Sequence, residues 1–256
     1  FDEKLLHHPE VLELKENYTI KVNESRFLIE DERLEVMRKP FHKAKQMIME
    51  AIKGGSQIIL RHDTDTDGYA AALSLEKGIV PLIQKIQDPR NISILFKRSS
   101  SRKPYYDLVD ATRDAMTAMT AKKFGHNEPL VILADFGSTS ESDLAIKKVQ
   151  SLGIKVLVID HHDFAEKSCA DHIVSPYLEG GDSSLCTGML GVELSNLLRE
   201  DPGLKDYAAL AGIMDKSPEE LIKKYNPDVE RLKERAEVID FEIQSAKFFD
   251  QPSTVD

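Results

Sequence analysis

The sequence predicts an α/β fold in which a parallel sheet is covered by helices on both faces. Short and almost wholly apolar segments (SQIIL at 56–60, PLVILAD at 129–135 and IKVLVID at 154–160) alternate with longer segments of helical periodicity. Strands that are buried on both faces have such continuous apolar runs, and the helices between them provide right-handed crossovers. Ligands of such sheets bind beyond the carboxyl ends of the strands.

The helices and strands are expected in a regular order. Residues 41–53 have helical periodicity and end at two consecutive glycines. The strand at 56–60 leads to a helix over 69–86, which Gly78 and Pro81 are expected to break. The elements that follow are a strand at 92–96 (ISILF), a helix at 107–124, a strand at 129–135, an amphipathic helix at 140–152 and a strand at 154–160.

The C-terminal part is expected to be helical. After Ser175 the strands stop, and a loop at 177–188 precedes helices at 189–200 and 204–214 and a short one from Ser217. A last helix, 228–249, has one narrow apolar seam formed by Val229, Leu232, Ala236, Ile239, Ile243 and Ala246. Packing along its own domain is the favoured interpretation of this seam. A connector to a further domain, or a docking surface for a partner, is the alternative.

Three regions are therefore expected: an unassigned extension at 1–39, a catalytic domain at 40–225 and a connector helix with its tail at 226–256. The extension has strand-like segments, YTIKV (18–22) and RFLIE (26–30). The chain begins with Phe1 rather than Met, so a fragment of a longer protein is one interpretation.

Composition excludes several classes of protein. A hydrophobic content of 41% with 30% charged residues is that of a globular protein, and 256 residues can bury a substantial core. The net charge of −10 argues against a general polyanion-binding protein. Cys169 and Cys186 lack CxxC spacing, which excludes a disulfide framework and a zinc site of that kind. No apolar run reaches membrane-spanning length and no signal peptide is expected, so we expect a cytoplasmic protein without a membrane partner.

Metal-ligand residues follow three of the expected strands. They are Asp63, Asp65 and Asp67 after the first strand, Asp135 at the end of 129–135, and Asp160, His161 and His162 at the end of 154–160. Carboxylates and imidazoles that meet at one edge of a sheet are costly to bury unless a cation lies between them. The pattern therefore predicts divalent metal, most simply a pair of ions, and points to hydrolysis of a phosphate ester.

Each motif also has a plainer interpretation. The D-x-D-x-D-G sequence ending at Gly68 resembles the start of an EF-hand loop, but Ser74 stands where that loop needs Glu, which disfavours calcium. Asp135 alone would suit a turn, and the paired histidines would suit an exposed surface. A fourth acid, Asp215, follows the apolar helix; simple solvation at the helix end and return to the metal site are about equally favoured.

In this combination and order, the motifs resemble those of the DHH phosphoesterase superfamily, and within it RecJ-type exonucleases, especially archaeal RecJ-like proteins. The resemblance covers roughly residues 56–216. It implies two Mn²⁺ or Mg²⁺ ions: Asp63 and Asp65 would hold one, Asp67, His161 and Asp215 the other, and Asp135 would bridge them. It also implies that His162 faces the substrate phosphate and that Asp160 orients the imidazoles.

The expected substrate-binding residues lie in three segments. The loop with Ser183, Ser184, Thr187 and Gly188 precedes a helix N-terminus that suits a phosphate oxygen, although an ordinary helix cap is the alternative. Residues 89–106 combine basic and aromatic side chains without an acid, which suits a nucleic-acid strand, although a solvated loop is nearly as favoured. From these segments and the first motif we select Arg98, Arg102, Lys103 and Tyr105, together with Arg61 and His62.

The function that we expect is a metal-dependent phosphodiesterase that trims single-stranded DNA or RNA, from the 5′ end as RecJ relatives do. Arg61 stands where other family members have a metal-binding His, which favours the RecJ branch. The alternatives are a phosphodiesterase for short oligonucleotides or cyclic dinucleotides, and a replication scaffold with little catalysis that binds replication proteins. No second Gly-rich motif of the DHH-associated substrate domain is present in the sequence.

Overall fold

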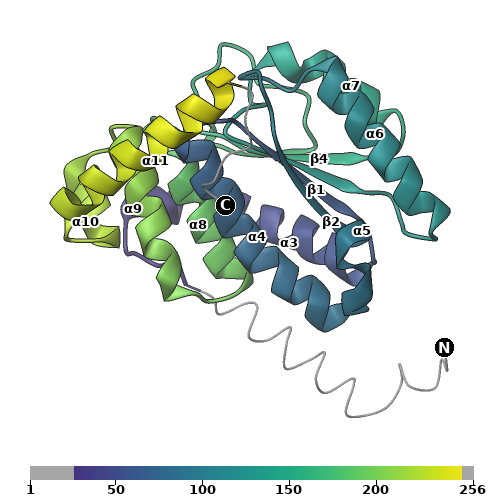
Figure 1. Ribbon diagram of the computed structural model, residues 1–256, viewed down its shortest axis with the longest axis horizontal. Helices are drawn as coiled ribbons and strands as arrows, with labels where there is room; N and C mark the ends of the chain where they lie inside the picture. The colour runs from purple at the N-terminus through teal and green to yellow at the C-terminus, as the bar shows by residue number, and fades with distance from the viewer. Residues whose placement is uncertain (1–25, 250–256) are drawn as a thin grey trace.

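The computed structural model of the protein describes residues 26–249, apart from the side chains of Gln244 and 246–249; the YTIKV segment lies outside the described residues. A sheet of five parallel strands forms the centre (Figure 1). The strands are β1 (Ile58–His62), β2 (Phe96–Ser100), β3 (Leu130–Ala134), β4 (Lys155–Ile159) and β5 (His172–Val174), in the spatial order β2-β1-β3-β4-β5. The predicted α/β fold class is confirmed.

Helices cover both faces of the sheet. The described helices are α2 (Glu32–Val36), α3 (Arg38–Lys53), α4 (Thr66–Ile86), α5 (Ile92–Leu95), α6 (Leu108–Lys123), α7 (Asp143–Gln150), α8 (Thr187–Leu198), α9 (Lys205–Met214), α10 (Glu219–Tyr225) and α11 (Val229–Phe249). In Figure 1, α6 and α7 lie on one side of the sheet and α3, α4 and α8 on the other. Alternate residues of the strands face the two sides: Ile59 and Val131 pack in the core with α6 and α7, whereas Ile58 and Ile132 pack in the larger core with α3, α4 and α8.

The register of the sheet brings the ends of three strands together. His62 of β1 lies opposite Ala134 of β3, and Ala134 lies opposite Ile159 of β4. The next residue of each strand continues the ladder, since the amides of Asp63 and Asp135 donate to the carbonyls of Ala134 and Ile159. The first acid of every predicted cluster therefore lies at the same edge of the sheet.

Helix α4 is not broken at Gly78 and Pro81, contrary to the prediction. A side chain at Gly78 would meet Ser195 of α8, with the added carbon 2.5 Å from Oγ, so the glycine permits close packing of the two helices. Pro81 leaves the carbonyl of Lys77 without its helical donor, and Nη2 of Arg199 donates to that carbonyl at 3.3 Å. The close packing of α8 at Gly78 and the hydrogen bond from Arg199 near Pro81 thus support the helix at the two residues that would weaken it.

Other predicted elements need correction as well. The pattern of the ISILF segment predicts a strand, but its first four residues form α5 and the edge strand β2 begins at Phe96. The strand β5 is not predictable from the pattern, because three residues are too few to produce one. Residues 26–30, which have a strand-like sequence, form no strand. They lie against α8, where the amide of Leu28 donates to Glu193 at 2.7 Å.

Helix α11 packs on its own domain, in agreement with the favoured interpretation of its seam. Val229, Leu232, Ala236 and Ile243 are buried, and the helix contacts α9 and α4. Its outward face exposes Val238 and Phe241. Both cysteines are free thiols. Among the described helices, none is long and apolar enough to cross a membrane.

Candidate metal centre

The acidic and imidazole side chains of the three motifs converge at the carboxyl edge of the sheet. Two groups have ligand atoms that all lie within 4.8 Å of one another: Asp63, Asp65 and Asp135 in one, Asp67, His161 and Asp215 in the other. A third group joins Asp135 to His161 and His162. Residues from the ends of β1, β3, β4 and α9 thus meet in one place. Two of the groups coincide with the ligand sets that the family resemblance implies.

His161 lies between the acids. Its Nε2 is 3.8 Å from Oδ2 of Asp67 and 3.7 Å from Oδ1 of Asp135, and its Nδ1 is 3.5 Å from Oδ2 of Asp215. Nδ1 is nevertheless a buried atom without a hydrogen-bond partner. An imidazole surrounded by carboxylates at these separations is arranged as a metal ligand would be, with room left for an ion.

Asp135 has the most unusual environment of the site. It is 1% exposed, its Oδ1 has no hydrogen-bond partner, and its backbone adopts the left-handed conformation with a φ of 69°. Burial raises its pKa well above the ordinary value, and the charges of Asp67, Asp65 and Asp160 raise it further. Strained backbone and an unsatisfied buried carboxylate persist where the surrounding structure enforces them, commonly at functional sites. A divalent cation would satisfy this oxygen, so the residues present fit a metal.

Asp67 is held by the N-terminus of α8. Its Oδ2 accepts from the amide of Thr187 and its Oδ1 from the amide of Gly188, both at 2.8 Å. The sequence predicts that this helix N-terminus holds a phosphate. In the structure the two amides fix a carboxylate instead, which the positive end of the helix dipole favours. The hydroxyl of Thr187 is buried and has no hydrogen-bond partner.

Asp160 organises the Asp-His-His motif. Its Oδ2 accepts from the amide and the hydroxyl of Ser138, and its Oδ1 accepts from Nδ1 of His162 at 2.7 Å. Burial opposes ionisation of Asp160, but the hydrogen bonds from His162 and Ser138 and the charge of His162 together outweigh it, and the pKa of Asp160 lies below the ordinary value. The same bond raises the pKa of His162 to about 9. His162 is exposed at the rim of the site, whereas His161 is buried within it.

The first motif is shaped by close backbone contact. Asp65 caps α4, because its Oδ1 accepts from the amide of Gly68 at 2.8 Å. A side chain at Gly68 would lie 2.5 Å from the carbonyl oxygen of Asp63, so glycine is required for the approach of the helix to the strand end. Gly68 is thus a residue of α4 whose lack of a side chain admits the neighbouring backbone.

Asp215 joins the site from the helical C-terminal part. It is the residue that ends α9, and burial raises its pKa to about 6. Its neighbour Lys216 has a left-handed φ of 58°. Of the two interpretations that the sequence leaves open for Asp215, proximity to His161 favours return to the metal site.

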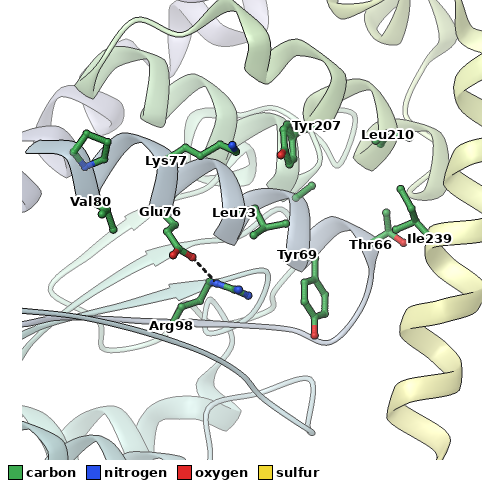
Figure 2. Close-up of a pocket in the computed structure, with 12 residues that line it drawn as sticks. Thr66, Tyr69, Leu73, Glu76, Lys77, Val80, Arg98, Tyr207, Leu210 and Ile239 are labelled. Atoms are coloured by element: carbon green, nitrogen blue, oxygen red, sulfur yellow. Dashed lines mark hydrogen bonds and ion pairs between the residues drawn. The ribbon is translucent and has the colours of Figure 1, made fainter. Parts of the chain in front are cut away.

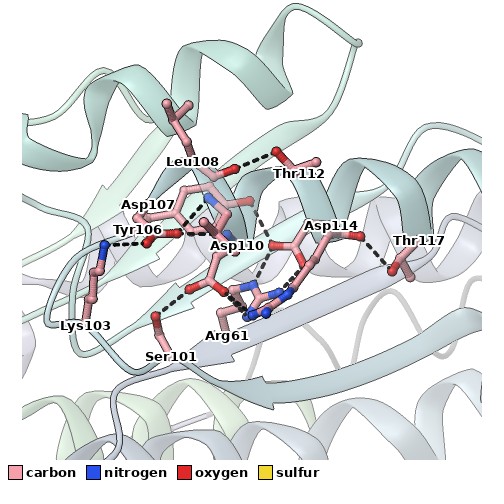
Figure 3. Close-up of polar contacts among 12 residues, drawn as sticks. Arg61, Ser101, Lys103, Tyr106, Asp107, Leu108, Asp110, Thr112, Asp114 and Thr117 are labelled. Carbon is pink, nitrogen blue, oxygen red and sulfur yellow. Dashed lines mark hydrogen bonds and ion pairs between the residues drawn. The ribbon is translucent and has the colours of Figure 1, made fainter.

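Arg61 is not placed to bind substrate, contrary to the prediction. Strand alternation directs it away from His62 toward α6, where its guanidinium makes two hydrogen bonds to Asp114 at 2.7 and 2.8 Å and an ion pair with Asp110 at 3.1 Å (Figure 3). It is 4% exposed. His62 is also fully buried, with its ring against Tyr69. Neither side chain can reach a ligand at the edge in this structure.

The other predicted substrate-binding residues are divided. Arg102 and Lys103 are exposed in the loop after β2, and Lys103 pairs with Asp107 and lies over the ring of Tyr105. Arg98 of β2 pairs with Glu76 of α4 at 2.7 Å. The nearby aromatics Phe96 and Tyr106 are buried core residues and cannot stack on a base. The amide of Ser184 donates to Asp182, and Ser183 is exposed. No contact of the described residues joins either serine to the acidic cluster.

Sequence reasoning missed the residue that fixes Asp160. Ser138 follows Asp135 in the segment FGSTS, and only the fold brings it to the end of the next strand. The signal in the sequence is a Gly-Ser turn after an apolar strand, which has many ordinary causes.

A parallel sheet with a carboxylate-imidazole cluster beyond its strand ends defines a class of α/β proteins in which such a cluster can hold a divalent metal. The chain belongs to the DHH family: residues 57–214 match the family's N-terminal domain. This confirms the resemblance that the motifs indicated. Membership supports a metal-dependent phosphoesterase.

Individual relatives agree with this assignment. An uncharacterized protein of Methanocaldococcus jannaschii is 37% identical over 261 residues, which is 90% of this chain and 34% of that protein. The chain therefore spans about a third of the length of that curated relative. The DHH domain of a member of a family of ribosomal proteins is 34% identical, with a TM-score of 0.81 over 95% of this chain and 61% of that one.

More distant structures share the fold. RecJ of Thermus thermophilus in complex with Mn²⁺ is 17% identical, with a TM-score of 0.56 over 80% of this chain and 31% of that one. An exonuclease RecJ bound to manganese is also 17% identical, with a TM-score of 0.53 over 82% of this chain and 54% of that one. The RecJ-like similarity that the motifs predicted is confirmed at the level of the fold.

Proposed function

We propose that the protein is a two-metal phosphodiesterase that hydrolyses single-stranded nucleic acid, with Mn²⁺ or Mg²⁺ as the cofactor. One observation carries the proposal: the buried and unpartnered Oδ1 of Asp135 lies between two groups of ligand-type side chains. Divalent cations, when bound, supply charge neutralisation and activation of water. A site for a pair of them suits hydrolysis of a diester.

Each residue of the centre has a proposed role. Asp63 and Asp65 hold one ion, Asp67, His161 and Asp215 hold the other, and Asp135 is shared between them. Asp160 fixes His162 through Nδ1, which leaves the exposed imidazole at the rim to contact the phosphate. The amides of Thr187 and Gly188 keep Asp67 in place.

The substrate class is supported by the basic strip, which we define as the exposed or half-exposed residues Lys97, Arg98, Arg102, Lys103 and Tyr105 on β2 and the loop after it. This strip follows an edge strand of the sheet, so another chain can approach it. In a protein of net charge −10, local cations beside an aromatic ring favour a polyanion at this place. Cleavage from the 5′ end and association with replication proteins are further parts of the proposal and rest on the family resemblance alone.

The domain limits are proposed as well. Residues 40–225 form the catalytic unit, and 226–256 form a connector helix with its tail, of which α11 packs on α9 and α4. The described part of 1–39 is integrated with this unit, because Leu34 and Met37 are buried in its core.

The experiment that tests the function is Mn²⁺-dependent degradation of end-labelled single-stranded DNA, RNA and dinucleotides. Asp135→Asn removes the negative charge and one oxygen of the proposed shared ligand, and Asp163→Asn is the matched control, since Asp163 adjoins the motif but is exposed and outside all three ligand groups. We expect both the wild type and the control to degrade the polymer, and the Asp135 variant to leave it intact. The position of the label then reveals the polarity.

Two other outcomes would replace the proposal. Cleavage of dinucleotides alone would make the protein a short-oligonucleotide phosphodiesterase. Binding of metal without cleavage of any substrate would favour the scaffold, in which the DHH fold supports partners rather than chemistry.

A further inference from the structure

A groove runs along α4 on the side of the domain that the edge strand β2 borders. It encloses about 670 Å³. Its lining extends along α4 from Thr66 to Pro81, with Arg98 of β2 on one side, Tyr207 and Leu210 of α9 on the other, and Ile239 of α11 at one end (Figure 2). Fifteen residue steps of helix correspond to about 22 Å. The groove is therefore long and narrow rather than a compact pocket.

The walls of the groove combine flat apolar surface with positive charge. Leu73 and the half-buried ring of Tyr207 provide the apolar surface, whereas Tyr69 lines the groove but is 8% exposed, with its ring against His62. Nζ of Lys77 lies 5.8 Å from the centroid of the Tyr207 ring, and Arg98 is held beside the groove by its ion pair with Glu76. Aromatic faces accept stacked bases of any sequence, and cations beside them neutralise the phosphates that join those bases.

One end of the groove reaches the metal-binding loop. Thr66, which lines the groove, lies between Asp65 and Asp67, and its hydroxyl bonds to Asp240 of α11 at 3.1 Å. On the β2 side, Nη1 of Arg98 is 3.4 Å from Nε2 of His62, the residue that precedes Asp63. Arg98 also belongs to the basic strip. The groove is thus continuous with both the metal loop and the strip.

We propose that this groove is a binding site for the bases of a single-stranded nucleic acid, with the phosphates turned toward Lys77 and Arg98. The inference rests on the proposed function, and it adds the route that the strand takes away from the centre. At a stacked spacing of about 3.4 Å per nucleotide, a groove of about 22 Å holds about six nucleotides.

Nucleic acid is favoured over a peptide for two reasons. The groove adjoins the centre that we propose hydrolyses a phosphate diester, so a substrate that continues from that centre into the groove would carry a phosphate backbone. The charged side chains that line the groove are Lys77, Arg98 and Glu76; Glu76 pairs with Arg98, so the net charge of the lining is positive through Lys77. A peptide would need its own polar backbone satisfied along mostly apolar walls.

Binding by fluorescence anisotropy tests the groove without cleavage, in the Asp135→Asn background, with labelled oligothymidylates of two to twelve nucleotides. Affinity should rise with length to about six nucleotides and then level off.

Tyr207→Leu should weaken binding of the longer oligonucleotides about tenfold, while Tyr207→Phe keeps the ring and should bind as the parent does. Lys77→Gln should lower the slope of log affinity against log salt by about one, whereas Lys85→Gln, on the same helix but outside the groove lining, should leave it unchanged.

The outcomes separate this inference from the proposed function. If the parent binds oligonucleotides but Tyr207→Leu binds them equally well, the groove is not the route, and a protein partner becomes its occupant. If the parent binds none at any length, the proposed substrate class fails together with the groove. An oligonucleotide that contains 4-thiothymidine should photo-crosslink to residues that line the groove. Mass spectrometry of the digested protein locates the crosslink and so tests the same route by a separate readout.

Discussion

Two acidic clusters of this domain are buried, and they differ in what offsets the cost of burying negative charge. On the α6 side of the sheet, Asp110 and Asp114 are neutralised by Arg61, and Asp114 also accepts from the hydroxyl of Tyr106 at 2.8 Å (Figure 3). At the carboxyl edge, no ion pair among the described residues joins Asp67 or Asp135 to an arginine or a lysine, and Asp135 keeps an unpartnered oxygen. The first cluster is complete without a ligand, whereas the second is not.

This contrast distinguishes a structural acid from a functional one. A buried carboxylate is tolerated when a guanidinium with good geometry satisfies it. Among the described residues no guanidinium or ammonium group pairs with Asp67 or Asp135, so the surrounding fold must hold these carboxylates together against repulsion. Glu193 is a third case: it accepts from Leu28 and Tyr225, and burial raises its pKa to about 7, so protonation rather than a cation neutralises this side chain as the pH falls below that value.

The largest expected effect is that of Asp135→Asn on catalysis. Loss of several kcal/mol of transition-state stabilisation corresponds to a decrease in rate of about a thousandfold. Asn tolerates the left-handed backbone as Asp does, and it removes a charge that its neighbours repel. The metal-free variant should therefore unfold at higher urea than the wild type. Lower stability in urea would show that Asp135 is a structural acid like Asp114.

Arg61→Met should lower the stability of the folded protein, whereas Asp135→Asn should raise it. The loss of Arg61 leaves Asp110 and Asp114 buried without their counterion, and we expect unfolding to become easier by about 3–5 kcal/mol at pH 7. Adding Asp114→Asn to the variant should recover part of the loss. Urea denaturation of the wild type, the two single variants and the double variant measures the coupling. A loss below about 1 kcal/mol in Arg61→Met would mean that the cluster is not held by Arg61.

Glu193→Gln tests whether protonation of Glu193 stabilises the folded protein. Because the pKa of Glu193 is raised from 4.5 to about 7 on folding, its contribution to stability is complete below about pH 4.5 and is lost as the pH rises through about 7. The wild type should lose on the order of 3 kcal/mol relative to the variant between these values. Thermal unfolding of both proteins from pH 4.5 to 8.5 measures the difference, and parallel curves would contradict it.

Addition of Mn²⁺ should stabilise the folded protein by neutralising the acidic cluster at the carboxyl edge of the sheet. At a hundred times the dissociation constant, an ion that binds only the folded protein stabilises it by about 2.7 kcal/mol. The gain should appear in the wild type and in Asp163→Asn but not in Asp135→Asn. Calorimetric titration gives the number of ions, and an equal gain in all three proteins would place the metal elsewhere.

The fold class and the meeting of the acidic and imidazole residues at one edge of the sheet follow from the amino-acid sequence alone. Apolar strands in alternation with helices require a parallel sheet, and residues directly after such strands must share one edge. The convergence of Asp63, Asp135 and Asp160 therefore follows from local pattern and one topological rule. Membership in the DHH family follows from the same motifs.

The role of each neighbouring residue, in contrast, depends on tertiary contacts. Arg61 and His62 differ by one position in a strand, yet alternation buries them on opposite faces, where α6 supplies two carboxylates to one and α4 supplies Tyr69 to the other. The amides of Thr187 and Gly188 bind Asp67, which is 120 residues from Thr187. Helix α4 continues through Pro81, and Arg199 donates to the carbonyl that Pro81 leaves without a helical donor. These outcomes depend on contacts between segments that are distant in the sequence, and local propensity does not predict such contacts.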